Sequence, residues 1–395
     1  MVRDLSAEAT FSPARLTAAR ELWRISSTEL AAQIGVSQGS ISHYEHRGVR
    51  PSDDVLGRLA RVLRVPVRYL FLGAPLARPD TTQIHYRGRA RIPMGERKRL
   101  EWLGAHWQEV AAHLARRGWL SEPKHKVPRF SGMSPAEAAQ ETRAFLGFEG
   151  PGPVGSMVEV LETLGVWIHV LPPGESENVD AFCFWHEGHP HVVINPAKGD
   201  LFRFRFDLAH ELAHLVMHDR AEEDERPLDR EADRFAAEFL VPLEAWADEC
   251  PGGSNPWAYE ETKARWQVSI GCLLRRSRDA GVLDDSEYRY AMMRYSKLGW
   301  RRGEPPMPDA EPRQEVPQLM AAGLAEARAE GVGFSALADE LGYGDELLAE
   351  ILGASARGGD APEREPSAPV VARQEPVSRD NVVDLAAMRL ARQAR

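Results

Sequence analysis

The chain has 395 residues, of which 43% are hydrophobic and 27% charged, and its formal net charge is -10. A chain of this length exceeds what one hydrophobic core usually organises, so we expect two or three compact units. No apolar stretch reaches the roughly 18 residues of a membrane-spanning helix, and the N-terminus lacks the apolar core of a signal peptide. These features exclude an integral membrane protein and favour a cytoplasmic protein.

The three cysteines, Cys183, Cys250 and Cys272, lie far apart and form no CxxC pair, so the sequence predicts neither a disulfide framework nor a cysteine-ligated zinc site. Charge is unevenly distributed. Residues 12–75 carry nine arginines against five acidic residues, and residues 76–130 carry twelve basic against five acidic residues. The remainder is therefore strongly acidic, and the basic N-terminal part is typical of a segment that contacts phosphates.

Residues 12–75 contain short helical patterns separated by brief turns, which predict a compact all-α domain. One helix begins at a serine cap near Ser27 and ends at Gly35. The next, from about Gln38 to His46, would lie in the major groove of DNA. The predicted contacts are base edges at Gln38, Ser40 and His43, and phosphates at Ser27, Arg47 and Arg50. The alternative is a helical bundle whose basic residues form a solvated face.

Residues 14–72 resemble the XRE, or Cro/C1 repressor, family. The family pattern "ELA...GVS...IS..E.G...P" is matched here, except that His46 and Arg47 intervene before Gly48. The resemblance implies a domain that binds a double-stranded DNA operator, and it implies a homodimer.

Residues 76–130 are basic and polar and predict a connector with one amphipathic helix over about 95–117. An α+β pattern follows. Helices are predicted over 134–148 and 154–164, a strand over 166–170, and a hairpin whose strands, 181–185 and 191–194, flank a turn at 187–190. Strand 191–195 would offer an edge to an extended peptide. Further helices are predicted at about 207–218, 229–240, 259–267, 270–280 and 285–298.

His210, Glu211 and His214 form an HExxH pattern on the helix predicted over 207–218. Histidines four residues apart project from one helix face and can share a tetrahedral zinc ion. Glu211 can accept a proton from a water molecule activated by the metal and pass it to a leaving amine. The sequence thus predicts a Zn²⁺ cofactor with Glu211 as the catalytic residue.

A site of this kind needs a third protein ligand. Glu231 lies in the first turn of an acidic, amphipathic helix, where its carboxylate would complete a two-histidine, one-glutamate set. Glu231 is therefore the predicted third ligand. Two alternatives stay open: Glu238, one heptad further on, and His218, which continues the spacing of the two motif histidines. The sequence nominates no residue to stabilise an oxyanion.

Residues 138–242 resemble the ImmA/IrrE family of metallopeptidases, and the stretches that carry the resemblance are 179–182, 205–214 and 231–242. The resemblance implies that the two motif histidines and Glu231 bind zinc and that the motif glutamate is the catalytic acid–base. The family pattern often has Asn where Asp233 stands and Met where Val241 stands. It also implies a protein substrate, a helix-turn-helix repressor, whose cleavage relieves repression in mobile elements or stress responses.

The predicted fold class is multi-domain: an all-α helix-turn-helix domain, an α+β zincin-like domain with a small sheet and an HExxH helix, a helical C-terminal region and a disordered tail. Composition beyond residue 353, with few aromatic residues, predicts the tail. The predicted boundaries are 12–75 for the DNA-binding domain, 76–130 for the basic helical connector, 131–310 for the metallopeptidase-like domain, 311–353 for the small helical region and 354–395 for the tail.

The leading interpretation is a DNA-binding transcriptional regulator whose zinc-dependent endopeptidase domain cleaves a helix-turn-helix repressor, or the chain itself, to relieve repression. The presence of Glu211 favours this interpretation, because metal binding alone needs no neighbouring base. Two alternatives are a transcription factor whose zinc domain acts as a sensor or dimerisation element without turnover, and an antitoxin-like autorepressor.

Overall fold

The computed structural model describes residues 10–73, 76, 78–80, 84–87, 92–121, 123–171, 178–196, 201–219, 226–305 and 315–353. The predicted disordered tail, residues 354–395, lies outside the described residues. Among the residues that are described, no helix has both the length and the apolar composition needed to cross a lipid bilayer.

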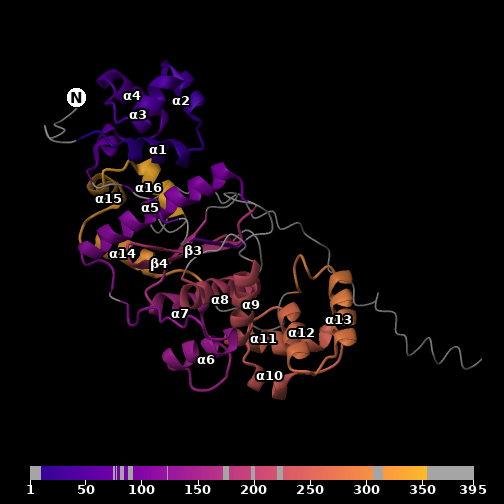
Figure 1. Ribbon diagram of the computed structural model, residues 1–395. Coiled ribbons are helices and arrows are strands. Elements are labelled where there is room, and N and C mark those ends of the chain that lie inside the picture. The colour runs from indigo at the N-terminus through magenta and orange to yellow at the C-terminus, as the bar shows by residue number, and fades with distance from the viewer. Residues whose placement is uncertain are drawn as a thin grey trace, which may run out of the picture. The chain divides into compact units, whose positions relative to one another are not determined.

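Short helices form the N-terminal domain (Figure 1). They are α1 (Pro13–Leu22), α2 (Ser27–Ile34), α3 (Gln38–His46), α4 (Asp53–Val62) and the 3-10 helix η1 (Val67–Phe71). A serine side chain caps the start of each α-helix by accepting a backbone N–H, and for α2 the cap is Ser26, one residue before the predicted one. Gly35 ends α2 in the left-handed conformation, with φ of 67°. The predicted all-α domain is confirmed.

A four-stranded mixed sheet follows. Its strands are β1 (His85–Arg87), β2 (Trp167–Val170), β3 (Ala181–His186) and β4 (His189–Ile194), in the order β1-β3-β4-β2. β3 pairs antiparallel with both β1 and β4, whereas β2 pairs parallel with β4. The hairpin and the strand near 166–170 agree with the sequence prediction. β1 was not predicted, because it lies in the segment interpreted as a connector.

The hairpin differs from its prediction in two respects. Its turn is Glu187-Gly188, whose φ angles of 48° and 83° are both positive, as a two-residue type I′ turn requires. His189 and Pro190, predicted to lie in the turn, therefore already belong to β4. Since β4 has β3 on one side and β2 on the other, the 191–195 strand does not offer the free edge expected from the sequence.

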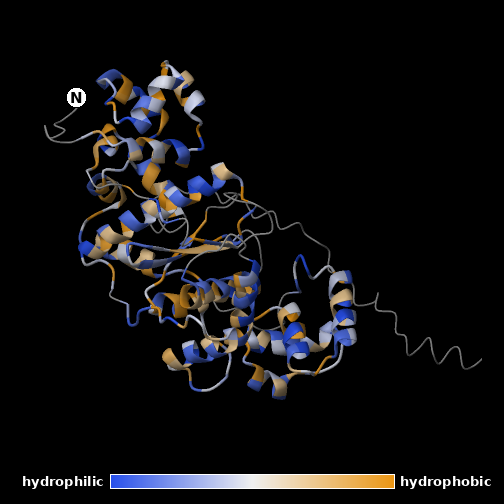
Figure 2. Ribbon diagram, viewed as in Figure 1, coloured by the Kyte–Doolittle hydropathy of each residue, from blue (hydrophilic) through white to orange (hydrophobic). Residues whose placement is uncertain are grey.

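The remaining helices cover the sheet and extend from it. They are α5 (Met94–Arg116), α6 (Pro135–Phe145), α7 (Met157–Thr163), α8 (Leu201–Met217), α9 (Arg226–Leu240), α10 (Leu243–Glu249), η4 (Pro256–Tyr259), α11 (Glu260–Trp266), α12 (Ile270–Asp279), α13 (Asp285–Lys297), α14 (Leu319–Ala329), α15 (Phe334–Leu341) and α16 (Asp345–Leu352). Many of them carry hydrophobic residues on one side and hydrophilic residues on the other (Figure 2).

The sheet separates two hydrophobic cores, with α5 on one side and α8 on the other (Figure 1). Alternate residues of a strand point to opposite faces. Accordingly, Phe182 and Phe184 belong to the core that contains α5, whereas Cys183 belongs to the core that contains α8. α5 approaches the sheet so closely that a Cβ atom at Gly104 would lie 2.8 Å from Phe184 Cζ.

A buried polar network joins the N-terminal domain to α5 and to the C-terminal helices. Arg15 of α1 is 1% exposed and forms an ion pair with Glu109 of α5, which also accepts the hydroxyl of Tyr343, between α15 and α16. Burial opposes ionisation of Glu109, but the hydrogen bond and charge of Arg15 outweigh it, so the pKa of Glu109 is lowered. The N-terminal domain thus shares one core with α5 and α14–α16.

Candidate metal centre and nucleic-acid interface

Helix α8 packs against β3 and β4 and carries the two motif histidines one turn apart. His210 and His214 are 1% and 2% exposed. Their Nε2 atoms lie 3.1 Å from each other. An ion about 2.0–2.1 Å from each of two tetrahedral ligands separates those ligands by roughly 3.3 Å. The histidine pair therefore fits one shared metal ion.

The carboxylate that the structure brings to both histidines belongs to Asp229, in the first turn of α9. Its Oδ1 atom lies 3.7 Å from Nε2 of His210 and 3.7 Å from Nε2 of His214. The three ligand atoms all lie within 4.8 Å of one another. Two imidazole nitrogens and one carboxylate oxygen form a donor set typical of a zinc site that keeps a coordination position open.

Glu231, the ligand predicted from the sequence, lies elsewhere in the structure. Its Oε2 atom is 3.2 Å from His218 Nε2, and its side chain is 45% exposed. His218 in turn places its Nδ1 atom 2.9 Å from Nδ1 of His214. Glu231 and His218 therefore form a row of hydrogen-bond contacts that ends at Nδ1 of His214, on the side of the ring away from its Nε2 atom. Glu238, the other acidic alternative, is buried away from the histidines in an ion pair with Arg276.

Asp233 holds His210 in the orientation that a metal would need. Its Oδ1 atom lies 3.0 Å from His210 Nδ1, so a proton on Nδ1 is donated to the carboxylate and the lone pair remains on Nε2. No role for Asp233 was predicted from the sequence.

The apolar stripe of α9 is the signal that would have found these carboxylates. Ala232, Phe235 and Ala236 are fully buried and mark the side of the helix that faces the core. Residues three, four and seven apart share a helix face, which places Asp229 with Ala232 and Ala236, and Asp233 one turn above Asp229. Glu231, two residues from Asp229, is turned by about 200°.

Glu211 and His85 complete the surroundings of the pair. Glu211 is fully buried on α8, beside His210. His85 of β1 stacks on His214, with ring centroids 4.4 Å apart and planes 19° from parallel. Burial, together with the nearby His218, lowers the pKa of His85 to about 4.

The predicted DNA contacts lie on α2, α3 and the segment after them. Gln38, His43, Arg47 and Arg50 are exposed, and Ser27 and Ser40 are partly exposed. Gln38 Nε2 lies 3.5 Å from Ser27 Oγ, while Ser40 Oγ lies 2.9 Å from Ser37 Oγ.

Two ion pairs affect the charge of the surface that carries the predicted DNA contacts. Glu45 points inward and pairs with Arg20 of α1, so it adds no negative charge to the exposed side of α3. Arg50 pairs with Asp53 at 2.6 Å, a contact that a phosphate would have to compete with.

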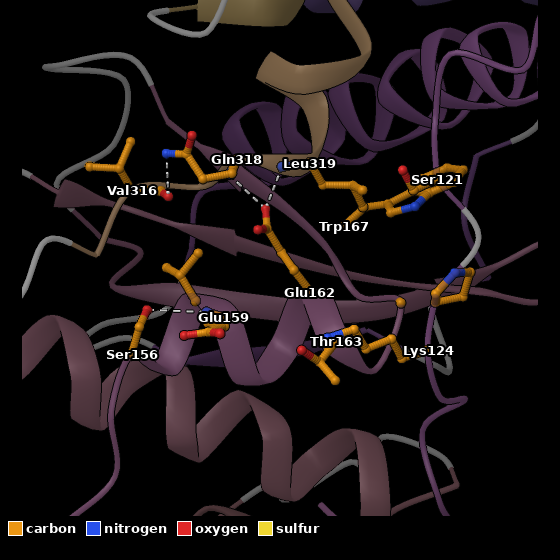
Figure 3. Close-up of a pocket in the computed structure, with 13 residues that line it drawn as sticks. Ser121, Lys124, Ser156, Glu159, Glu162, Thr163, Trp167, Val316, Gln318 and Leu319 are labelled. Carbon is orange, nitrogen blue, oxygen red and sulfur yellow. Dashed lines mark hydrogen bonds between the residues drawn. The ribbon is translucent and has the colours of Figure 1, made fainter.

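A cavity of about 510 Å³ lies between α7, β2 and the start of α14 (Figure 3), and neither His210 nor His214 lines it. The carboxylate of Glu162 accepts the backbone N–H groups of Gln318 and Leu319, each at 2.8 Å, and burial raises its pKa. The Glu162 carboxylate is thus already engaged in holding the start of α14.

Comparison with protein families assigns both parts of the chain. Residues 16–70 match the helix-turn-helix family, and residues 161–278 match the IrrE N-terminal-like domain, a peptidase family. The chain fuses an XRE-type helix-turn-helix domain to an IrrE-like domain. The IrrE-like match covers α8 and α9, and with them the histidines and carboxylates of these helices described above. It does not include β1 and α5, which precede it in the chain. No curated protein matches the chain.

Proposed function

We propose that this protein is a DNA-binding regulator whose IrrE-like domain is a zinc endopeptidase that cleaves a helix-turn-helix repressor or a second copy of this chain. The observation that carries the proposal is the juxtaposition of His210 Nε2 and His214 Nε2 on α8 with Asp229 Oδ1 on α9. The helix-turn-helix domain supports double-stranded DNA as the partner. The preference for a repressor as substrate rests on the family resemblance.

In this proposal His210, His214 and Asp229 hold the metal, and Asp233 fixes the tautomer of His210. A zinc ion in such a site acts as a Lewis acid and lowers the pKa of a water molecule to about 7. The carboxylate of Glu211 takes a proton from the attacking water and delivers it to the nitrogen of the leaving amine. The hydrophobic core around α8 keeps bulk water away from that proton transfer.

The test compares the wild-type chain with Glu211→Gln. Both proteins should contain one equivalent of zinc after dialysis, because Glu211 is not among the proposed ligands. Full-length Glu211→Gln protein, carrying an affinity tag, then serves as the substrate, since it presents a helix-turn-helix domain and cannot cut itself. Wild-type protein should convert it to fragments detectable by mass spectrometry, and untagged Glu211→Gln protein should not.

Cleavage by the Glu211→Gln protein would contradict the mechanism. Zinc in both proteins with no cleavage of this substrate or of a co-purified repressor would favour the alternative, a regulator whose metal domain is a sensor. Loss of zinc in Glu211→Gln would show that the glutamate is needed to build the site and would contradict its assignment as a proton carrier alone.

A further inference from the structure

A run of basic residues interrupts the acidic part of the chain. Residues 288–303 contain five basic residues and no aspartate or glutamate, although the chain outside residues 12–130 is strongly acidic. The run covers most of α13 and the segment that follows it. In the view of Figure 1, α13 is the outermost helix of the group α10–α13. The five basic residues are Arg289, Arg294, Lys297, Arg301 and Arg302.

Three of these residues share one face of α13 with two large apolar side chains. Each helix residue is rotated by about 100° from the one before it, so residues 289, 290, 293, 294 and 297 fall within an arc of about 140°. The opposite side carries Ala291 and Tyr295, which are buried in the core that contains α8. On the arc, Tyr290 and Met293 are 49% and 58% exposed. We call this face, together with residues 301 and 302, the α13 surface.

Nearby acidic groups do not neutralise the α13 surface. Within the described residues none of its five basic side chains forms an ion pair, and Arg289 and Arg301 donate only to a backbone carbonyl and to a serine hydroxyl. Glu304, the first acidic residue after the run, has a side chain that is 1% exposed and paired with Lys263. Its carboxylate also accepts the backbone N–H groups of Ile270 and Gly271. The positive charge of the α13 surface therefore faces solvent uncompensated.

Stabilisation of the helix explains only part of this pattern. Basic residues in the last turn of a helix interact favourably with its dipole, which accounts for Arg294 and Lys297. It does not account for Arg301 and Arg302, which lie beyond the helix, or for the exposed Met293. The α13 surface thus has the features of a binding surface for a polyanion.

We propose that the α13 surface binds the phosphate backbone of duplex DNA, so that the IrrE-like part of the chain has a DNA contact separate from the helix-turn-helix domain. Lysine and arginine side chains that neutralise phosphates release counterions, and this supplies affinity without sequence preference. DNA is favoured over an acidic protein because basic residues surround the two apolar side chains, which leaves no continuous apolar centre of the kind found in protein interfaces. The helix-turn-helix domain also brings duplex DNA to the molecule. This inference goes beyond the proposed function and requires neither zinc nor cleavage.

The first test identifies what contacts the surface. Met293 of the full-length protein is replaced by a photo-crosslinking residue, and the protein is irradiated with a duplex of random sequence. A protein–DNA adduct should form, and its yield should fall as the salt concentration rises. Met133, which is 42% exposed just before α6, is the control position and should give little adduct. Equal yields at the two positions, or an adduct at Met293 with a second protein chain in place of DNA, would overturn the proposal.

The second test measures affinity for the same duplex by mobility shift. The starting protein carries Arg47→Ala and Arg50→Ala, which remove predicted phosphate contacts of the helix-turn-helix domain. Adding Arg289→Gln and Lys297→Gln should reduce the slope of log K against log salt by about two, because each lost phosphate contact removes about 0.9. Adding Arg265→Gln and Arg328→Gln instead removes the same charge from exposed positions outside the α13 surface and should leave the slope unchanged.

Equal slopes for the two added pairs would contradict DNA binding by α13, as would a starting protein that no longer binds the duplex. The same variants distinguish a protein partner. If Arg289→Gln with Lys297→Gln slowed cleavage of tagged Glu211→Gln protein while DNA binding stayed the same, the surface would belong to substrate recognition and the DNA assignment would fail. Because DNA binding is measured without zinc, a failure of the peptidase assignment leaves both DNA tests intact.

Discussion

At the scale of single residues, the identity of the third ligand depends on two carboxylates two positions apart. Asp229 faces both motif histidines, whereas Glu231 contacts His218. Asp229→Ala should therefore lose the bound zinc, since only two ligands from α8 and α9 would remain. Glu231→Ala should retain one equivalent, with affinity lowered about 10–100-fold because only the orientation of His218 and His214 is disturbed. Elemental analysis after dialysis distinguishes the two.

Retention of zinc by Asp229→Ala together with its loss in Glu231→Ala would support the ligand set predicted from the sequence. Asp229→Glu serves as the matched control, because it keeps a carboxylate and should keep the metal.

Gln38 is the exposed residue of α3 best suited to read a base, because a glutamine can form two hydrogen bonds with adenine. Gln38→Ala should weaken binding to a selected operator by about 1–3 kcal/mol and leave binding to random DNA unchanged. Operators selected from a random pool would be measured by mobility shift at fixed salt. Ser42→Ala, which changes another exposed residue of the same helix, is the control. Equal loss on both DNAs would reject a role in base recognition.

At the scale of elements, an ion pair between α8 and the start of the C-terminal region supports the HExxH helix. Arg205 and Glu315 are 0% and 1% exposed, and Glu315 also accepts the N–H groups of Met157 and Val158 at the start of α7. Glu315→Ala should lower the free energy of unfolding by about 3–5 kcal/mol, because it leaves a buried cation uncompensated. Urea denaturation followed by tryptophan fluorescence measures the loss.

Glu159→Ala, on the exposed side of α7, is the comparison and should change the free energy of unfolding by less than about 0.5 kcal/mol. A similarly small effect of Glu315→Ala would show that the backbone carbonyl groups around Arg205 are enough to stabilise its buried guanidinium group without the carboxylate.

The sequence predicted the helices and the hairpin well, because caps, glycines and periodicity are local signals. It missed β1, a three-residue strand whose existence depends on the edge of β3, far along the chain. It identified the motif histidines from their spacing alone. The carboxylate that completes the site was harder to predict. Asp229 and Glu231 lie in the same turn, and only the rotation of α9 about its axis decides which of them faces α8. The DNA-contact residues remain predictions, since exposure does not establish contact.

At the scale of the whole molecule, buried histidines make stability depend on pH. Burial lowers the pKa of His106 to about 4 and that of His169 to about 3, and burial beside His169 also lowers the pKa of His191. These folded pKa values lie below the unfolded value of about 6.5, so the folded state binds fewer protons. The stability they contribute is complete above about pH 6.5 and is lost as the pH falls towards 4.

At pH 5.5 each of these histidines should reduce the free energy of unfolding by about 1 kcal/mol relative to pH 7.5. His106→Phe removes one of these histidines, together with its hydrogen bond to Tyr69. The variant is less stable at both pH values, but its loss between them should be smaller than that of the wild type by about that amount. An identical loss would mean that His106 does not titrate on unfolding.

The pairing of β1 with β3 also sets an order of assembly during synthesis. β1 leaves the ribosome directly after the DNA-binding domain, whereas β3 follows only after α5, α6 and α7 have been made. N-terminal domains fold first, and contacts that are local in the chain form before distant ones. A nascent chain therefore forms the helices of its helix-turn-helix domain before α8 and α9, which carry the candidate metal ligands, have been made.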